Sequence, residues 1–425
     1  MPHDYLDGVI GLDVAEVVDW RKPLIRGSKD QVLSVYANVI LPLRYDPAWA
    51  GVIGFDRMRN AVMALKPLPC AELMRAPEGD DYPRLWTHAD DLLAREWLEM
   101  TDFRRVSMEI VSNAVGAVAR ENAYHPVLRY LDGLRHDGVP RIEGGSTPGG
   151  DTVESWLSRY LGVEENRYTR AVGKVLLLSM IARVRKPGCK VDTVPILEGR
   201  QGAGKSTACR IIGGAWFSDA LPDIRSKDAE GHLAGKWLVE LTELEALGKA
   251  DAAVLKSFLT RQVGRFRPAY ERREVEQPRQ TIFLGTTNEG AYLKDATGGR
   301  RFLPVRVGEI DLLALEDDRD QLLAEADALY QAGHAWHMID PETLRMAAEE
   351  QAERYESDPW HEAVARYLRT RDQVTVGEVM QEALEIETPR LDRRGQNRVR
   401  AILLTLGWRQ MPKGTAGIRP WRAAC

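Results

Sequence analysis

The 425-residue sequence predicts an α/β protein with a parallel sheet at its centre and smaller domains on either side. Between residues 194 and 307, short apolar runs alternate with longer helical patterns, as in parallel sheets. The pattern from 35 to 119 is helical, and after 360 three helical stretches precede two short strand-like ones. We therefore expect a mainly helical N-terminal domain (1–145), an α/β core (150–356) and a winged-helix-like C-terminal domain (357–425).

A phosphate-binding motif organises the predicted core. The stretch 199–206, GRQGAGKS, fits G-x-x-x-x-G-K-[ST] and lies between an apolar run at 194–197 and a helix that begins at Lys205. Its glycines let backbone N–H groups curl around a phosphate, and the helix adds further donors and a partial positive charge. Lys205 is expected to reach the β- and γ-phosphates, and the Ser206 hydroxyl to ligate Mg²⁺. The residues expected to hold the nucleotide are Gly199, Arg200, Gln201, Gly202, Ala203, Gly204, Lys205, Ser206 and Thr207. The sequence thus predicts a P-loop NTPase core that binds ATP and Mg²⁺.

Two glutamates lie at the end of the next apolar run, 237–241. A nucleotide-hydrolysing site needs acidic groups there, one to hold Mg²⁺ and one to orient the attacking water. Side chains alternate along a strand, so Glu240 and Glu243 face opposite ways unless the strand ends between them. Glu243 is the better candidate for activating water and Glu240 the second. The alternative is a surface turn that carries both glutamates.

Two further polar features follow the strand predicted at 281–287. Open α/β sheets bind ligands at the carboxyl ends of their strands, so Asn288 is expected near the γ-phosphate. Arg300 and Arg301 lie on the next loop, and one of them is expected to reach a neighbouring subunit's nucleotide as an arginine finger. The alternative is a surface pair that precedes the strand predicted at 302–307.

An arginine-rich segment, 261–273, is the candidate nucleic-acid contact. Arginines can track a phosphate backbone while the interleaved Phe266 and Tyr270 stack on bases. The arginines expected to contact nucleic acid are Arg265, Arg267, Arg272 and Arg273. A solvated basic face or a subunit contact is an equal alternative. Because the chain carries a net charge of −5, such contacts must come from local patches like this one. The last predicted helix also has a basic face, formed by Arg393, Arg394, Arg398 and Arg400.

Several classes of protein are excluded by what the chain lacks. Its four cysteines have neither C-x-x-C spacing nor neighbouring histidines, which indicates reduced thiols rather than zinc sites or disulfides. The first residues lack the basic and apolar regions of a signal peptide. The most apolar run, 172–184, is interrupted by Lys174 and is too short to span a bilayer. We expect a cytoplasmic protein with no membrane contact.

The order of these motifs resembles the virulence-associated E family. The P-loop is followed by WLVELTEL (237–244), RFRPAY (265–270), TTNE (286–289) and GGRRFLPV (298–305), with YHPVLRYLDGL (124–134) and DGVPR (137–141) upstream. The resemblance covers roughly residues 35–310. Family members are ATPases of phages and mobile elements, similar to superfamily 3 helicases, which implies an AAA+-like core and hexameric rings. By motif, Lys205 and Ser206 match Walker A, Glu240 and Glu243 the Walker B region, Asn288 sensor 1, and Arg300 or Arg301 the finger.

These patterns and the resemblance lead to one main functional hypothesis. It is a Mg²⁺-dependent ATPase that acts as a replicative DNA helicase for a phage or mobile genetic element in a bacterial host. Its expected partners are single-stranded or forked DNA, further copies of the chain in a ring, and replication proteins. Met1 lies close to the helicase-like part, so no priming module is expected. The alternatives are an ATP-dependent regulatory or assembly factor that binds a partner protein without unwinding DNA, and a passive origin-binding protein dominated by its C-terminal region.

Overall fold

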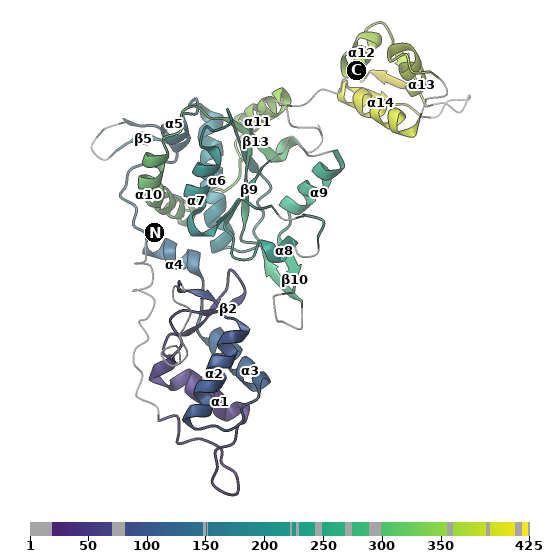
Figure 1. Ribbon diagram of the computed structural model, residues 1–425. Helices are drawn as coiled ribbons and strands as arrows, with labels where there is room; N and C mark the ends of the chain where they lie inside the picture. The colour runs from purple at the N-terminus through teal and green to yellow at the C-terminus, as the bar shows by residue number, and fades with distance from the viewer. Residues whose placement is uncertain are drawn as a thin grey trace.

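The computed structural model divides into an N-terminal unit, a central sheet covered by helices, and a C-terminal module (Figure 1). It describes residues 19–69, 81–147, 150, 152–221, 223–226, 229–242, 249–267, 274–288, 299–354, 360–387, 392–412 and 419–423. Within these ranges, no helix is both long and apolar enough to cross a membrane.

The N-terminal unit combines helices with a small sheet. Its helices are α1 (Tyr36–Tyr45), α2 (His88–Thr101) and α3 (Met108–Glu121), and its strands are β1 (Ile53–Asp56), β2 (Ala61–Ala64), β3 (Arg84–Leu85) and β4 (Ala123–Tyr124). The sheet order is β3-β2-β1-β4. The expectation of a helical pattern throughout 35–119 is therefore wrong for the β1–β2 hairpin. Neither β1 (IGFD) nor β2 (AVMA) alternates between apolar and polar residues, and the turn depends on Asn60 adopting a positive φ of 55°.

The central sheet confirms the predicted α/β class. Its strands are β7 (Val194–Glu198), β8 (Phe217–Ser218), β9 (Leu238–Leu241), β12 (Ile282–Thr287) and β13 (Phe302–Arg306). They are all parallel, in the order β13-β7-β12-β9-β8. Every residue of β7, β9 and β12 is buried, as expected for a parallel sheet covered on both faces. The apolar runs of the sequence therefore correspond to the central strands.

Helices cover both faces of this sheet. One face packs against α6 (Arg167–Arg185), α7 (Lys205–Gly213) and α11 (Pro341–Glu353). In the same core cluster, α4 (Pro126–Gly133), α5 (Trp156–Leu161) and α10 (Leu312–Gln331) pack against α6. The other face packs against α8 (Ala229–His232) and α9 (Lys249–Leu259). Neighbouring residues of a strand serve opposite faces, so Ile196 belongs to the second cluster and Leu197 to the first. The first cluster also includes Val127 and Ile142, which precede the domain boundary expected at 145–150.

Three smaller elements remain, the first of which is the antiparallel pair of β5 (Gly145–Ser146) and β6 (Thr152–Val153). An antiparallel hairpin of β10 (Val263–Phe266) and β11 (Val275–Pro278) lies between β9 and β12 in the sequence. The C-terminal module contains α12 (His361–Leu368), β14 (Gln373–Val374), α13 (Val376–Glu378) with a π-helical turn (Val379–Ala383), α14 (Arg393–Thr405), β15 (Trp408–Gln410) and β16 (Trp421–Ala423). Its antiparallel sheet, ordered β14-β16-β15, encloses a separate core that includes Trp408 and Trp421.

Candidate functional site

The P-loop follows β7 directly and ends at the first residue of α7. Gly202 and Gly204 have positive φ angles of 78° and 89°, a region that favours glycine. Position 199 has no room for a larger residue, because a Cβ atom there would lie only 2.7 Å from Val307 Cγ2. The Gly199 N–H donates to the carbonyl of Thr287 on β12 at 3.3 Å. The loop therefore lies at the carboxyl ends of two neighbouring strands.

Lys205 connects the loop to the end of β12. Its Nζ atom donates to the carbonyl oxygens of Gly199 at 2.6 Å and Arg200 at 2.8 Å, and to Asn288 Oδ1 at 2.9 Å. The lysine is buried although its ammonium group is charged, so it depends on these acceptors. The structure thus brings together Lys205 and Asn288, which were both predicted as site residues.

Ser206 and Glu240 form the second contact of the site. The Ser206 hydroxyl donates to Glu240 Oε1 at 2.6 Å, and the Thr286 hydroxyl donates to the same oxygen at 2.7 Å. Glu240 is completely buried, and its Oε2 atom has no hydrogen-bond partner in the described part of the chain. Sequence reasoning missed Thr286, although its place near the end of β12 was the available signal.

This arrangement fits a magnesium ion. Mg²⁺ takes oxygen ligands, commonly one or two carboxylates together with substrate phosphates and water. Glu240 Oε2 is a buried carboxylate oxygen with unused capacity beside a hydroxyl. No cluster of three His, Cys, Asp or Glu side chains that could hold a metal occurs among the residues described, so phosphate oxygens and water would complete the shell. Glu243, the other predicted acidic residue, lies outside the described residues.

A buried thiol lies close to this carboxylate. Burial, and then the charge of Glu240, raise the pKa of Cys209 on α7 well above its usual value. The thiol therefore stays protonated at neutral pH and is unreactive, because the thiolate is the nucleophilic form. Cys209 contributes packing, not chemistry.

A buried ion pair holds the strand that leads into the P-loop. Arg354, at the end of α11, donates from Nε to both oxygens of Glu198 at 3.0 and 3.2 Å, and from Nη2 at 3.1 Å. Arg354 also pairs with Glu350 and Glu353. Sequence reasoning missed both members of the pair. Glu198 is the one charged residue of β7, which was a usable signal, but nothing local marks Arg354 as its partner.

The predicted arginine finger residues lie next to the edge strand of the sheet. Arg300 and Arg301 belong to a 3₁₀ turn (Gly299–Arg301) that leads into β13, the neighbour of β7. Arg300 is exposed and Arg301 is half-buried. Within the described part of the chain, neither arginine forms a hydrogen bond or ion pair with a P-loop residue, and a role in a neighbouring subunit stays a prediction.

The hairpin presents only part of the predicted nucleic-acid contact. Arg265 and Arg267 are exposed, and Arg265 forms an ion pair with Glu276 on the opposite strand. Phe266 is buried, which contradicts its expected role in stacking on bases, because strand alternation turns it inward. Its ring packs toward Gly231 of α8. Arg272, Arg273 and Tyr270 lie outside the described residues.

Comparison with known proteins identifies one family and a set of distant structures. The family model of the virulence-associated protein E-like domain matches residues 142–356. This match begins and ends further along the chain than the resemblance noted in the sequence, which covers roughly residues 35–310. No curated protein matches the chain. The A form apo structure of the NrS-1 C-terminal region (305–718) is 13% identical, covers 88% of this chain and 96% of that chain, and has a TM-score of 0.38. A second A form apo structure of that region is 14% identical, with the same coverage and a TM-score of 0.37.

Proposed function

The chain belongs to the virulence-associated protein E-like family, and from this premise we propose that it is a Mg²⁺-dependent ATPase that acts as a replicative DNA helicase. The proposed genetic context is a phage or other mobile element. The observation that carries the proposal is the contact of 2.6 Å between the Ser206 hydroxyl and Glu240, beside the Lys205–Asn288 pair. These four side chains are the types that nucleotide hydrolysis requires at a P-loop.

Each residue of the site has a definite task under this proposal. Lys205 exchanges its loop carbonyls for β- and γ-phosphate oxygens, and the amino end of α7 adds backbone donors. Ser206 and Glu240 would hold Mg²⁺, which would supply stabilisation of the charge that develops on the phosphate oxygens. Because Glu240 is assigned to Mg²⁺, Glu243 remains our candidate for activating water. Asn288 positions the γ-phosphate beside Lys205.

The proposal includes an AAA+-like ring of identical subunits, for which we expect six copies. The insertion of β12 between β7 and β9 supports the core assignment, because it places Asn288 between the P-loop and Glu240. In such a ring, Arg300 or Arg301 of one subunit would stabilise charge at the nucleotide of the next. ATP would then bind between subunits.

DNA contact is proposed at two places. Arg265 and Arg267 are exposed on the hairpin, where they can contact a phosphate backbone. Residues 360–425 carry twelve Arg and Lys and seven Asp and Glu, a formal +5, whereas the whole chain carries −5. Three helices with an antiparallel sheet support a winged-helix-like module, in which Arg393 and Arg400 lie exposed on α14. Because this module is positively charged while the whole chain is negatively charged, we expect it to bind nucleic acid more strongly than the rest of the chain does.

Steady-state ATP hydrolysis with and without single-stranded DNA tests the proposal, together with displacement of a strand from a forked duplex. We expect DNA to stimulate turnover, and ATP to drive displacement. Lys205→Ala should lower turnover by about 100-fold or more, because it removes a charge aimed at the transferred phosphate. Lys190→Ala is the matched control, since this exposed lysine pairs only with Asp192 among the described residues.

Three outcomes of these assays are informative. Near-normal turnover of Lys205→Ala, with the control also normal, would contradict the ATPase assignment. An ATP turnover rate that is the same with and without DNA, together with no strand displacement, would favour an ATP-dependent factor that acts on a partner protein. Stimulation with displacement would establish the helicase, and particle mass by light scattering would then measure the ring.

A further inference from the structure

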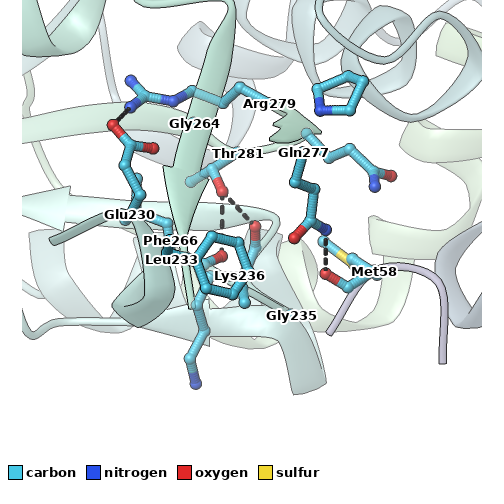
Figure 2. Close-up of a pocket in the computed structure, with 13 residues that line it drawn as sticks. Met58, Glu230, Leu233, Gly235, Lys236, Gly264, Phe266, Gln277, Arg279 and Thr281 are labelled. Carbon is cyan, nitrogen blue, oxygen red and sulfur yellow. Dashed lines mark hydrogen bonds and ion pairs between the residues drawn. The ribbon is translucent and has the colours of Figure 1, made fainter. Parts of the chain in front are cut away.

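A buried carboxylate, Glu230, holds both strands of the β10–β11 hairpin at their base. Glu230 lies on α8, and its Oε1 atom accepts from Arg261, just before β10, and from Arg279, just after β11, each at 2.6 Å. Figure 2 shows Arg279 reaching Glu230 beside Gly264 of β10. The side chains of Arg279 and Glu230 are only 2% and 8% exposed. The two ends of the hairpin are therefore tied to one oxygen atom.

The surrounding packing keeps this cluster in place. The Arg279 guanidinium lies over the rings of Phe258 and Phe283, at 4.7 and 5.8 Å from their centroids, and donates to the Phe258 carbonyl. A Cβ atom on Gly264 would lie 2.4 Å from Glu230 Oε2, so the carboxylate packs directly against the strand backbone. The Arg279 N–H closes the hairpin by donating to the Gln262 carbonyl at 2.8 Å.

The cluster lies at the opposite end of the strands from the nucleotide site. Glu230 precedes β9, which carries Glu240, and Arg279 precedes β12, which ends beside Asn288. The two strands are parallel neighbours in register, with Leu284 of β12 opposite Glu240. The anchoring residues thus lie ahead of the strands, Glu230 on α8 before β9 and Arg279 just before β12, whereas the nucleotide-site residues lie toward the carboxyl ends of the strands.

We propose that Glu230 is a positioning residue that couples the nucleotide site to the DNA-contacting hairpin. This inference rests on the proposed function. A buried carboxylate cannot release its guanidinium partners without leaving charge unpaired, so the hairpin base and the starts of β9 and β12 move as one body. A shift of these strands on nucleotide binding is therefore passed to Arg265 and Arg267.

The second anchor of the hairpin provides a matched control. On β11, Gln277 Nε2 donates to the Met58 carbonyl of the N-terminal unit at 2.9 Å. This contact holds the hairpin through a neutral amide, and the Met58 carbonyl also accepts from the Gly235 N–H ahead of β9 at 3.0 Å. Gln277→Ala removes this neutral contact but keeps the ion pairs of Glu230 with Arg261 and Arg279, so it should loosen the hairpin while leaving its response to nucleotide intact.

The test compares full-length Glu230→Gln with the wild type by two measurements. Hydrogen–deuterium exchange of residues 263–278 is followed with and without a non-hydrolysable ATP analogue, and the ratio of DNA-stimulated to basal turnover is measured. In the wild type and in Gln277→Ala, the analogue should change exchange in the hairpin. In Glu230→Gln we expect this response to disappear and the stimulation ratio to fall at least about fivefold. Basal turnover should stay within about twofold, because Glu230 touches no reacting atom.

Failure of the coupling and failure of the proposed function give different results. If nucleotide binds to the wild type without changing hairpin exchange, or if Glu230→Gln keeps the wild-type response, the coupling is overturned. If DNA does not stimulate the wild type, the helicase assignment fails, while the exchange measurement still decides the coupling. Should Glu230→Gln not fold, Arg261→Gln removes the more exposed partner and leaves the Arg279 pair, and it should lower the stimulation ratio. An unchanged ratio and exchange response in that variant would overturn the proposal.

Discussion

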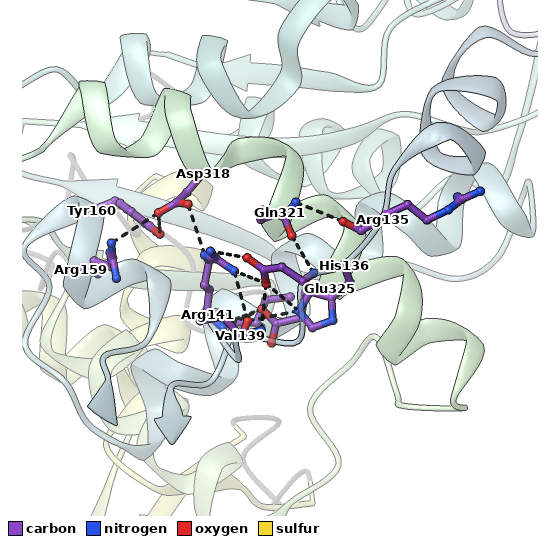
Figure 3. A network of polar contacts seen from close by, with 11 residues as sticks. Arg135, His136, Val139, Arg141, Arg159, Tyr160, Asp318, Gln321 and Glu325 are labelled. Carbon is purple, nitrogen blue, oxygen red and sulfur yellow. Dashed lines mark hydrogen bonds and ion pairs between the residues drawn. The ribbon is translucent and has the colours of Figure 1, made fainter. Parts of the chain in front are cut away.

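The nucleotide end of the central sheet and the junction between residues 135–142 and α10 are both rich in polar groups, but only the nucleotide end has a buried carboxylate oxygen without a hydrogen-bond partner among the described residues. At the nucleotide end, Glu240 Oε2 is buried with no partner in the described part of the chain. At the junction, the charged groups compensate one another (Figure 3). Arg141 pairs with Asp137 at 2.8 Å and Asp318 at 3.4 Å, and Tyr160 donates to Asp318 at 2.7 Å.

Glu325 shows most clearly how the junction differs. Its Oε2 atom accepts the backbone N–H groups of Arg141 at 2.8 Å and Ile142 at 3.0 Å, which attaches the segment ahead of the core to α10. Burial raises the pKa of Glu325, although both N–H groups oppose the shift. Both regions therefore contain a buried glutamate that accepts two hydrogen bonds on one oxygen, but among the described residues only Glu240 has its second oxygen fully buried without a partner. A buried carboxylate oxygen without a partner calls for an explanation, and a bound Mg²⁺ would provide one.

The largest effect on stability should come from the buried Arg354–Glu198 ion pair at the nucleotide end, in which both charges are compensated. Arg354→Met leaves Glu198 buried without its guanidinium, which should lower the free energy of unfolding by about 3–5 kcal/mol. Urea unfolding measures this loss. Adding Glu198→Gln should restore much of the stability, because the unpaired charge is removed. A double variant as unstable as the single one would show that lost packing, not charge, dominates.

Glu240→Gln should separate activity from stability. Replacing the unpartnered oxygen with an amide removes the negative charge offered to Mg²⁺, so turnover should fall on the order of 100-fold, about 2.7 kcal/mol. The Mg²⁺ concentration for half-maximal turnover should rise, while the unfolding midpoint stays close to that of the wild type. A large loss of stability with normal Mg²⁺ dependence would mean that Glu240 is a structural residue like Glu325.

The junction should show the reverse behaviour. Glu325→Ala leaves two buried N–H groups unsatisfied and should lower the unfolding free energy by about 1–3 kcal/mol. Glu325→Gln keeps an acceptor oxygen and avoids burying a charge, so it should cost much less. Both variants should retain the Mg²⁺ dependence of the wild type, measured as above. A changed Mg²⁺ dependence in either variant would contradict the assignment of Glu325 to a structural role.

The smallest expected effect depends on pH. The hydrogen bond from Arg141 lowers the pKa of Asp137 to about 2. An unfolded aspartate titrates near 3.9, so Asp137 stabilises the fold above about pH 4 and loses this contribution as the pH falls toward 2. Because the side chain is 40% exposed, we expect less than about 1 kcal/mol. Urea unfolding of Asp137→Asn and wild type should differ at pH 6 and converge near pH 2. An equal difference at both values would contradict this assignment.

By itself, the sequence determined the local elements of this protein. The spacing of Gly204, Lys205 and Ser206 predicts a loop and a helix because these residues act within one turn of each other. The apolar runs predict β7, β9 and β12 because burial on both faces requires continuous apolar residues. The N-terminal hairpin was missed because the residues of β1 and β2 do not alternate between apolar and polar types.

The tertiary structure alone decided which of these elements are neighbours. The order β13-β7-β12-β9-β8 brings Thr286 to Glu240, and the packing of α11 brings Arg354 to Glu198. Likewise, Glu230 meets its two arginines only because α8 packs beside the hairpin. Local periodicity records whether a residue is buried, but not what it is buried against. Partners that are distant in the chain are chosen by non-local packing, which leaves no pattern around either residue.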